Sequence, residues 1–408
     1  MKAMINEKEL INIFVLNGPL LYFSISAILG FRADPESGAG ISYKIYMVSL
    51  LLIGLYSWWR GFVQRGEYTV AEILPLFILF FYAVVGIIQG YANNPVYLQM
   101  VCFSFPAVCI ALNMDGRDDL AIVMKWMDLL LLFFSFAFIF MIRNIFIAKM
   151  EDPTAYDQNA SYMIAYCFLV DIFLLSHNKS YPKFSFLDKK WYRTLKILML
   201  PYFLIMIFFG GGRGAFVTVL IGLAVVGLGK LRAINPRFVI KGLFGFIALV
   251  LVMLFVLGNI DEEYAALLND NFGRIFSVIA DGGLDTSASS GRDDIWLEAF
   301  HHIVDRPVFG YGIYSYLAVM NMHPHNIVLE ILLQGGLVLL SIYIVFFVRL
   351  SSKYSIMCYD DEKQIWLAPF IIFTITELLF SASYMFEPFF WFSFSYIYNY
   401  RFLDYQQE

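Results

Sequence analysis

The sequence predicts an all-α polytopic membrane protein, with about twelve transmembrane helices and one large, partly helical external loop. Three observations lead to this fold class. Hydrophobic residues make up 60% of the 408 residues and charged residues only 15%, whereas about a quarter of a soluble domain is charged. Apolar stretches near the length that crosses a bilayer recur from end to end. Lysine and arginine fall mostly on one side of the resulting topology. We expect a single membrane domain over residues 1–408.

The apolar stretches predict the spans in chain order. They cover residues 10–31, 42–59, 70–90, 96–113, 120–145, 159–176, 194–210, 214–229, 242–259, 326–348, 364–382 and 387–401. The spans 214–229 and 387–401 are short for a transmembrane helix. The first apolar run has no small-residue cleavage site, so we expect a retained span and not a signal peptide.

The basic residues orient these spans. With the N-terminus inside, the outside segments hold only Arg32, Arg143, Lys149, Arg213, Arg274, Arg292 and Arg306. Because basic residues accumulate on the cytoplasmic side, we expect both termini in the cytoplasm. The modest net charge of −5 argues against a nucleic-acid partner. The four cysteines lie in apolar runs or in a cytoplasmic loop, and they predict no disulfide framework.

One connection is long: residues 260–325, between the ninth and tenth spans, lie outside in this topology. Within it, "SSGRDDIWLEAFHHIVDRP" predicts a helix that stops before Pro307. One stripe of this helix consists of Arg292, Trp296, Ala299 and Ile303 at helical spacing. We expect the stripe to lie against the membrane domain.

Arg213 is the first candidate functional residue. In "FFGGGRGAF", residues 208–216, it lies in a tight external turn between two spans. Gly211 and Gly212 let the backbone approach a ligand, and successive N–H groups can form an anion nest. The following helix presents its positive end outward, and the guanidinium adds a fork that suits phosphate. The turn thus predicts an anion site. The alternative is a helical hairpin with a snorkelling arginine.

Two more external arginines are candidates for the same anion. Arg292 lies in the first turn of the loop helix, where N–H groups also favour anions. Its alternative is a solvated ion pair with Asp293 or Asp294. Arg274, in "NFGRIFSVI", is a third candidate.

The external histidines offer either a metal site or a base. They are His301, His302, His323 and His325. Zinc is one alternative, but H-x-H and H-H pairs are not a specific zinc signature, and we expect no metal and no cofactor. His325 directly precedes the tenth span, where it can accept a proton near neutral pH. His323 is expected to orient the loop or an acceptor, or else to face water.

Two further polar residues accompany His325. Asn326 is the predicted N-cap of the tenth span. Glu330 lies one turn later, where an ionisable residue usually faces the protein interior; its alternative is solvation at the interface. Among the charges inside spans, Lys125 and Asp128 have the spacing of a local ion pair, whereas Asp171 and Glu377 have no assigned role.

With these residues identified, the chain resembles the O-antigen polymerase and O-antigen ligase superfamily. Four segments carry the resemblance in the family's order: "GGGRGAF", "SGRDDIW", "RPVFGYGIYSY" and "HPHNIVLEILLQGG". They fall within residues 208–340, and the first half of the chain matches only in topology. One departure follows Gly336, where Leu337, Val338 and Leu339 come next. Family members commonly have a small or β-branched residue three positions after the glycine.

The resemblance implies an integral-membrane glycosyltransferase that acts on oligosaccharides carried by undecaprenyl pyrophosphate. It implies a metal-independent, inverting reaction at the periplasmic face of the bacterial inner membrane. The family's two arginines correspond to Arg213 and Arg292, and its histidine to His325. The chemistry agrees, since arginines can offset the charge of a leaving pyrophosphate and a histidine can activate an acceptor hydroxyl. Substrate contacts are expected from Arg274, His323, Asn326, Glu330, Gly211 and Gly212.

We expect a polymerase that joins repeat units of an O-antigen or a related surface polysaccharide. Membrane lipids surround it, and a chain-length regulator is a candidate partner. The alternative is a ligase that transfers the finished chain to lipid A core. A lipid-linked oligosaccharide flippase is less favoured, because transporter sites lie near the bilayer midplane between repeats. Here the notable residues cluster at the outer face and no repeat is visible.

Overall fold

The structure is a computed structural model that describes residues 6–30, 41–66, 68–70, 72–114, 119–151, 158–177, 189–229 and 292–400. Regular secondary structure within these ranges is helical throughout, as the sequence predicts. Eight stretches are long and apolar enough to cross a membrane by length and composition. The ninth predicted span, Arg274 and the external loop up to residue 291 lie outside the described residues. The count of twelve spans and the external placement of the loop stay predictions.

Within the described residues, the helices follow the predicted spans in chain order, apart from the ninth, which lies outside them. Those of membrane length are α1 (Glu7–Leu29), α2 (Ile41–Arg65), the run of α4 (Pro95–Gln99), the π-helix η1 (Met100–Ser104) and α5 (Phe105–Asn113), then α6 (Asp119–Glu151), α7 (Gln158–Ser176), α8 (Lys190–Gly210), α14 (Ile327–Asp360), and the run of η6 (Glu362–Leu367) and α15 (Ala368–Phe380). Three predicted spans form shorter helices, which are α3 (Leu74–Ile88), α9 (Arg213–Gly229) and α16 (Pro388–Asn399). The loop contributes α12 (Arg292–Asp305) and α13 (Ser315–Val319).

Helix α14 is broken at Gly336, whose φ of 59° and ψ of −156° are not helical. The segment 307–312 fills the break. Its Pro307 carbonyl accepts a hydrogen bond from Leu337 N at 2.8 Å, and Gly312 N donates to Gln334 O at 2.8 Å. Backbone groups exposed by a break at membrane depth need partners within the protein. Backbone hydrogen bonds therefore join the segment 310–312, "GYG", to the segment 333–336, "LQGG".

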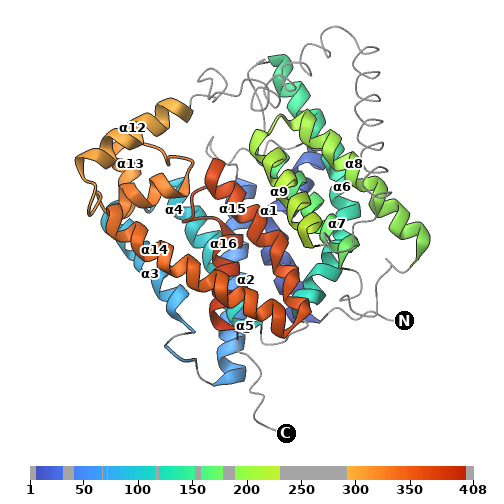
Figure 1. Ribbon diagram of the computed structural model, residues 1–408, viewed down its shortest axis with the longest axis horizontal. Coiled ribbons are helices and arrows are strands. Elements are labelled where there is room, and N and C mark those ends of the chain that lie inside the picture. Colours follow the sequence, from blue (N-terminus) through green and yellow to red (C-terminus); the bar gives the residue numbers. More distant parts are fainter. Residues whose placement is uncertain are drawn as a thin grey trace.

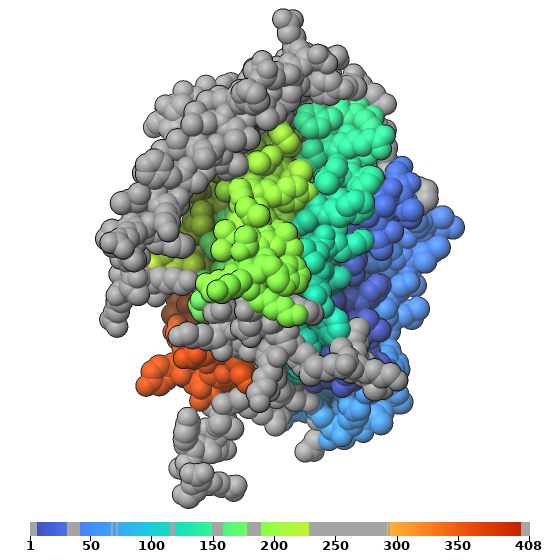
Figure 2. Space-filling view, turned by 90° about the vertical axis from the view of Figure 1, so that its right-hand side faces the viewer, coloured from blue at the N-terminus to red at the C-terminus, as the bar shows by residue number. Residues whose placement is uncertain are grey.

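The helices form two packed groups joined at the middle of the molecule. Figure 1 shows α6, α7, α8 and α9 on one side, and α3, α12, α13 and α14 on the other, with α1, α15 and α16 between them. α6 and α8 lie side by side on the face seen in Figure 2. α7 is the most enclosed span, because it packs against α6, α8, α9 and α15. The N-terminal turn of α7 contacts Arg292 at the start of α12 and Gly212 in the turn before α9.

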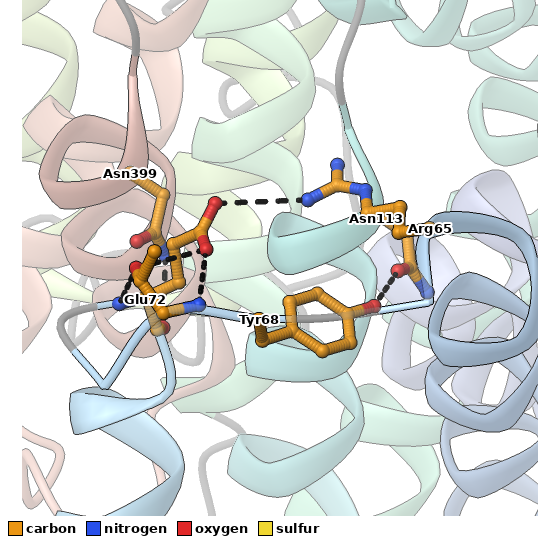
Figure 3. Close-up of polar contacts among 6 residues, drawn as sticks. Arg65, Tyr68, Glu72, Asn113 and Asn399 are labelled. Carbon is orange, nitrogen blue, oxygen red and sulfur yellow. Dashed lines mark hydrogen bonds and ion pairs between the residues drawn. The ribbon is translucent and has the colours of Figure 1, made fainter.

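Loops predicted to share a side of the membrane meet at the same end of the bundle. At the end predicted to be cytoplasmic, Lys8 forms a 2.9 Å ion pair with Asp119. Figure 3 shows a second cluster there: the Tyr68 hydroxyl donates to Asn113 Oδ1 at 2.8 Å, and Arg65 reaches Glu72 at 3.9 Å. These contacts tie together segments that the topology places on one side.

Three ionisable residues are buried between α6, α7 and α8. Lys196 Nζ lies 2.8 Å from Asp128 Oδ1 and 3.8 Å from Asp171 Oδ1. The Tyr192 hydroxyl also donates to Asp128 Oδ1, at 3.1 Å. The sequence predicted a local pair of Asp128 with Lys125, but the buried partner of Asp128 is Lys196 of another helix. This triad gives Asp171 its position, which spacing along one helix cannot predict.

Candidate active site

His323 and His325 converge on one backbone oxygen. His323 Nε2 donates to the Ser381 carbonyl at 2.9 Å, and His325 Nδ1 donates to the same oxygen at 2.6 Å. The ring centroids lie 4.1 Å apart. Ser381 directly follows α15, where a helix leaves carbonyls without intrahelical partners. The two histidines therefore bind the C-terminal end of α15 to the N-terminal end of α14.

Local backbone structure fixes His325 in this position. Asn326 is the N-cap of α14, as predicted, and its Oδ1 accepts from Val328 N at 2.9 Å. Its Nδ2 donates to Leu379 O at 3.2 Å, so Asn326 also holds the end of α15. His325 has a φ of 53°, a left-handed conformation that is uncommon outside glycine and that clusters at functional sites. Trp296 of α12 donates from Nε1 to Pro324 O at 3.0 Å.

The hydrogen bonds assign the proton on each neutral ring, because a carbonyl oxygen can only accept. Nδ1 of His325 therefore carries its proton, and Nε2 is the basic nitrogen. Burial lowers the pKa of His323 to about 3. The neighbouring His325 and Arg292 add to this effect, and the bond to Ser381 opposes it. His323 is thus neutral at physiological pH, and its charge does not compete with protonation of His325.

The glycines around Arg213 pack against α7. Gly211 has a φ of 71° and ends α8 in the left-handed conformation. A Cβ at Gly212 would collide with Ser161, and one at Gly214 would collide with the Tyr162 hydroxyl. The close approach that these glycines permit is thus to α7, and their contact with a ligand stays a prediction.

The half-buried Arg213 begins α9 at the same end of the molecule as the histidines. The next residue, Gly214, lies against Phe380, which precedes Ser381. The turn and the histidine pair therefore approach the same end of α15.

Arg292 reaches the same region from the loop. It begins α12, as predicted, and its NH2 group donates to Gln158 Oε1 at 2.8 Å, at the first residue of α7. The predicted stripe of α12 is partly confirmed, since Ala299 and Ile303 are buried. Arg292 is close enough to His323 to lower the pKa of that ring. Arg292 and the glycine turn that precedes Arg213 thus both lie against the first turn of α7, although they are far apart in the sequence.

Glu330 is buried in α14 and faces the protein interior, as predicted. Its Oε1 accepts from the Ser383 hydroxyl at 2.5 Å and from Gln334 Nε2 at 3.4 Å. These contacts hold the loop between α15 and α16. Glu330 is not among the residues that line the cavity beside the histidines.

A cavity of about 210 Å³ opens beside the histidines and contains polar residues to which the sequence assigned no role. Its walls come from α1, α7, α15 and the start of α16, and they include Tyr166, Glu377 and Glu387. The sequence could have indicated Glu377 as a candidate, because an ionisable residue inside a membrane span is a functional candidate by default. Glu387 and Tyr166 had none, since their approach depends on packing between distant helices.

The described part of the chain contains no group of three or more His, Cys, Asp and Glu side chains placed to share a metal ion. His301 and His302 lie on α12, an element separate from the segment that carries His323 and His325.

Comparison with known proteins identifies one domain. Residues 198–344 match the family model described as O-antigen ligase. No curated protein and no solved structure matches the chain. The matched segment contains Arg213, Arg292, His323 and His325, whereas Ser381 and the two cavity glutamates lie beyond it.

Proposed function

We propose that this chain, which carries an O-antigen ligase family domain over residues 198–344, is a polysaccharide polymerase. Its donor and its acceptor are oligosaccharide repeat units on undecaprenyl pyrophosphate, at the periplasmic face of the inner membrane. The glycan of one unit is transferred to a sugar hydroxyl of another. The family and the apolar helices support a membrane glycosyltransferase of this general kind.

The position of His325 carries the proposal. Its Nδ1 proton is committed to the Ser381 carbonyl, so Nε2 is the nitrogen that can accept a proton. It lies at the end of the bundle where two arginines from distant segments also gather. A base beside two cations suits a reaction in which a hydroxyl loses a proton while an anionic group leaves.

The proposed reaction is a single displacement. The acceptor hydroxyl gives its proton to Nε2 of His325 as its oxygen bonds to the anomeric carbon of the donor. The bond from that carbon to the pyrophosphate oxygen breaks, and the electron pair stays with the lipid pyrophosphate. Arg213 and Arg292 stabilise the charge that develops there. Attack from the face opposite the leaving group inverts the anomeric centre.

A ligase is the second candidate, because the matched family is described as O-antigen ligase. Both enzymes would use the same donor and the same three residues. The purified protein in nanodiscs, given a radiolabelled lipid-linked repeat unit and lipid A core together, separates them. Saccharides of several repeat units support the polymerase. Label only on lipid A core replaces it with the ligase, and no product at all contradicts both.

A further inference from the structure

The cavity beside the histidines is lined by both basic and acidic residues. His323 and His325 line it, and so do Glu377 and Glu387. Glu387 is the N-cap of α16, and its Oε1 accepts from Phe389 N at 3.1 Å. Glu377 lies one helical turn before Ser381, whose N–H donates to the Glu377 carbonyl at 2.7 Å. Glu377 and Glu387 therefore lie before and after Ser381, the residue whose carbonyl both histidines contact.

Three buried polar atoms of the residues that line the cavity lack a hydrogen-bond partner among the described residues. They are Glu377 Oε2 and the hydroxyls of Tyr162 and Tyr166, two tyrosines that are at most 2% exposed. A buried polar group without a partner costs free energy, and native proteins usually satisfy such groups. All three residues line the cavity. A ligand with hydroxyl groups in this cavity would supply the missing partners.

Aromatic rings form the rest of the wall around these polar atoms. Tyr166 stacks on Phe389 with centroids 4.9 Å apart, and Phe386 meets the His323 ring edge-on at 5.7 Å. All of these residues line the cavity. Carboxyl and hydroxyl groups between aromatic faces suit a ring that is apolar on its faces and carries hydroxyls at its edge. A sugar ring has this character.

The charges assign this cavity to the acceptor and not to the pyrophosphate. A pyrophosphate needs cationic partners, but neither Arg213 nor Arg292 lines the cavity, whereas two acidic residues do. We infer that the cavity binds the terminal sugar of the acceptor, with Glu377 accepting a hydrogen bond from a hydroxyl that does not react. This inference rests on the proposed function and adds the acceptor subsite to it.

The test compares Glu377→Gln with wild type, and uses Glu298→Gln as a matched control, because Glu298 is exposed on α12. The acceptor is a repeat unit on an alkyl group without pyrophosphate, which can accept but cannot donate. The KM for this acceptor is measured at fixed donor, and the KM for the lipid-linked donor at fixed acceptor. Calorimetric titration of the same alkyl repeat unit measures its Kd without any reaction.

Glu377→Gln replaces one carboxyl oxygen by an amide nitrogen, so a sugar hydroxyl that donates to that oxygen loses its acceptor, and loss of one hydrogen bond weakens binding by about two- to tenfold. Glu377→Gln should raise the acceptor KM and Kd by this factor and leave the donor KM and the thermal midpoint unchanged. Glu298→Gln should behave as wild type. Equal acceptor affinity in wild type and Glu377→Gln overturns the inference, even if transfer occurs. Absence of transfer with any donor contradicts the proposed function alone, because the titration still reports on the cavity.

Discussion

His323 and His325 share one acceptor oxygen, and their protonation states therefore depend on each other. With ring centroids 4.1 Å apart, charging one ring makes charging the other less favourable. Burial keeps His323 neutral by lowering its pKa to about 3. His323 thus orients the Ser381 carbonyl without adding charge, and His325 is the member of the pair suited to proton transfer.

The low pKa of His323 predicts a loss of stability in acid. Below the ordinary histidine pKa of about 6.5 the unfolded chain takes up a proton, whereas folded His323 stays neutral down to about pH 3. Stability therefore falls as pH decreases through this window, by at most about 1.4 kcal/mol per pH unit from this residue. His323→Gln, which keeps a donor for Ser381, should flatten the thermal midpoint against pH between 6.5 and 4 in detergent. An unchanged slope would contradict the assignment.

Arg213 is expected to act through its planar fork as well as its charge. Arg213→Ala should lower kcat by about 10²-fold or more, as removal of an oxyanion donor does. Arg213→Lys should recover only part of it, because an ammonium cannot form two parallel bonds to a phosphate. Turnover is measured with a labelled lipid-linked donor. The control is Arg306→Ala, an exposed arginine that follows α12, which should keep full activity. Wild-type turnover of Arg213→Ala would remove the pyrophosphate role.

At the scale of elements, the apolar runs predicted helix identity well and helix ends less well. The span predicted at 326–348 forms a helix that continues to Asp360. Hydropathy ends at the charged Arg349, but backbone hydrogen bonding continues into the polar segment beyond it. Nor does composition predict that Gly336 breaks the helix, because the break is satisfied by residues 307–312.

The break in α14 predicts a strong penalty for a side chain at Gly336. Its backbone conformation is nearly exclusive to glycine, and a Cβ there would collide with Val308. Gly336→Ala should therefore destabilise the protein by about 1–3 kcal/mol. Gly227 of α9 has open space around its Cβ position, so Gly227→Ala should be neutral or slightly stabilising. Thermal midpoints in detergent compare the two. Equal midpoints would mean that the segment 307–312 does not occupy the break.

In the whole molecule, successive spans of the predicted topology run in opposite directions, so every second loop lies at the end of the bundle that carries the candidate site. His325, Arg213 and Arg292 were predictable as candidates from their motifs, and the structure brings them to one end of the bundle. The cavity was not predictable, since α1, α7, α15 and α16 build it from segments far apart in the chain. Ser381 was equally hidden, because only its backbone oxygen takes part.

The topology predicts which end of the bundle faces the periplasm. In a cysteine-free background, cysteine is placed at Met322, exposed at the histidine end, or at Tyr359, which is 94% exposed near the end of α14. A membrane-impermeant maleimide should label only the Met322→Cys protein in intact spheroplasts, and both proteins after permeabilisation. Labelling of Tyr359→Cys in intact spheroplasts would reverse the orientation.

The proposed reaction requires His325 to remove the acceptor proton during transfer from a lipid pyrophosphate. The most direct measurement is single-turnover transfer from a radiolabelled lipid-linked repeat unit by the wild type, His325→Ala and His301→Ala, reconstituted at equal protein levels. His301 is exposed on α12 and serves as the matched control. We predict that His325→Ala loses about 10²–10⁴-fold in rate, while His301→Ala matches wild type. Transfer by His325→Ala at the wild-type rate would contradict the claim.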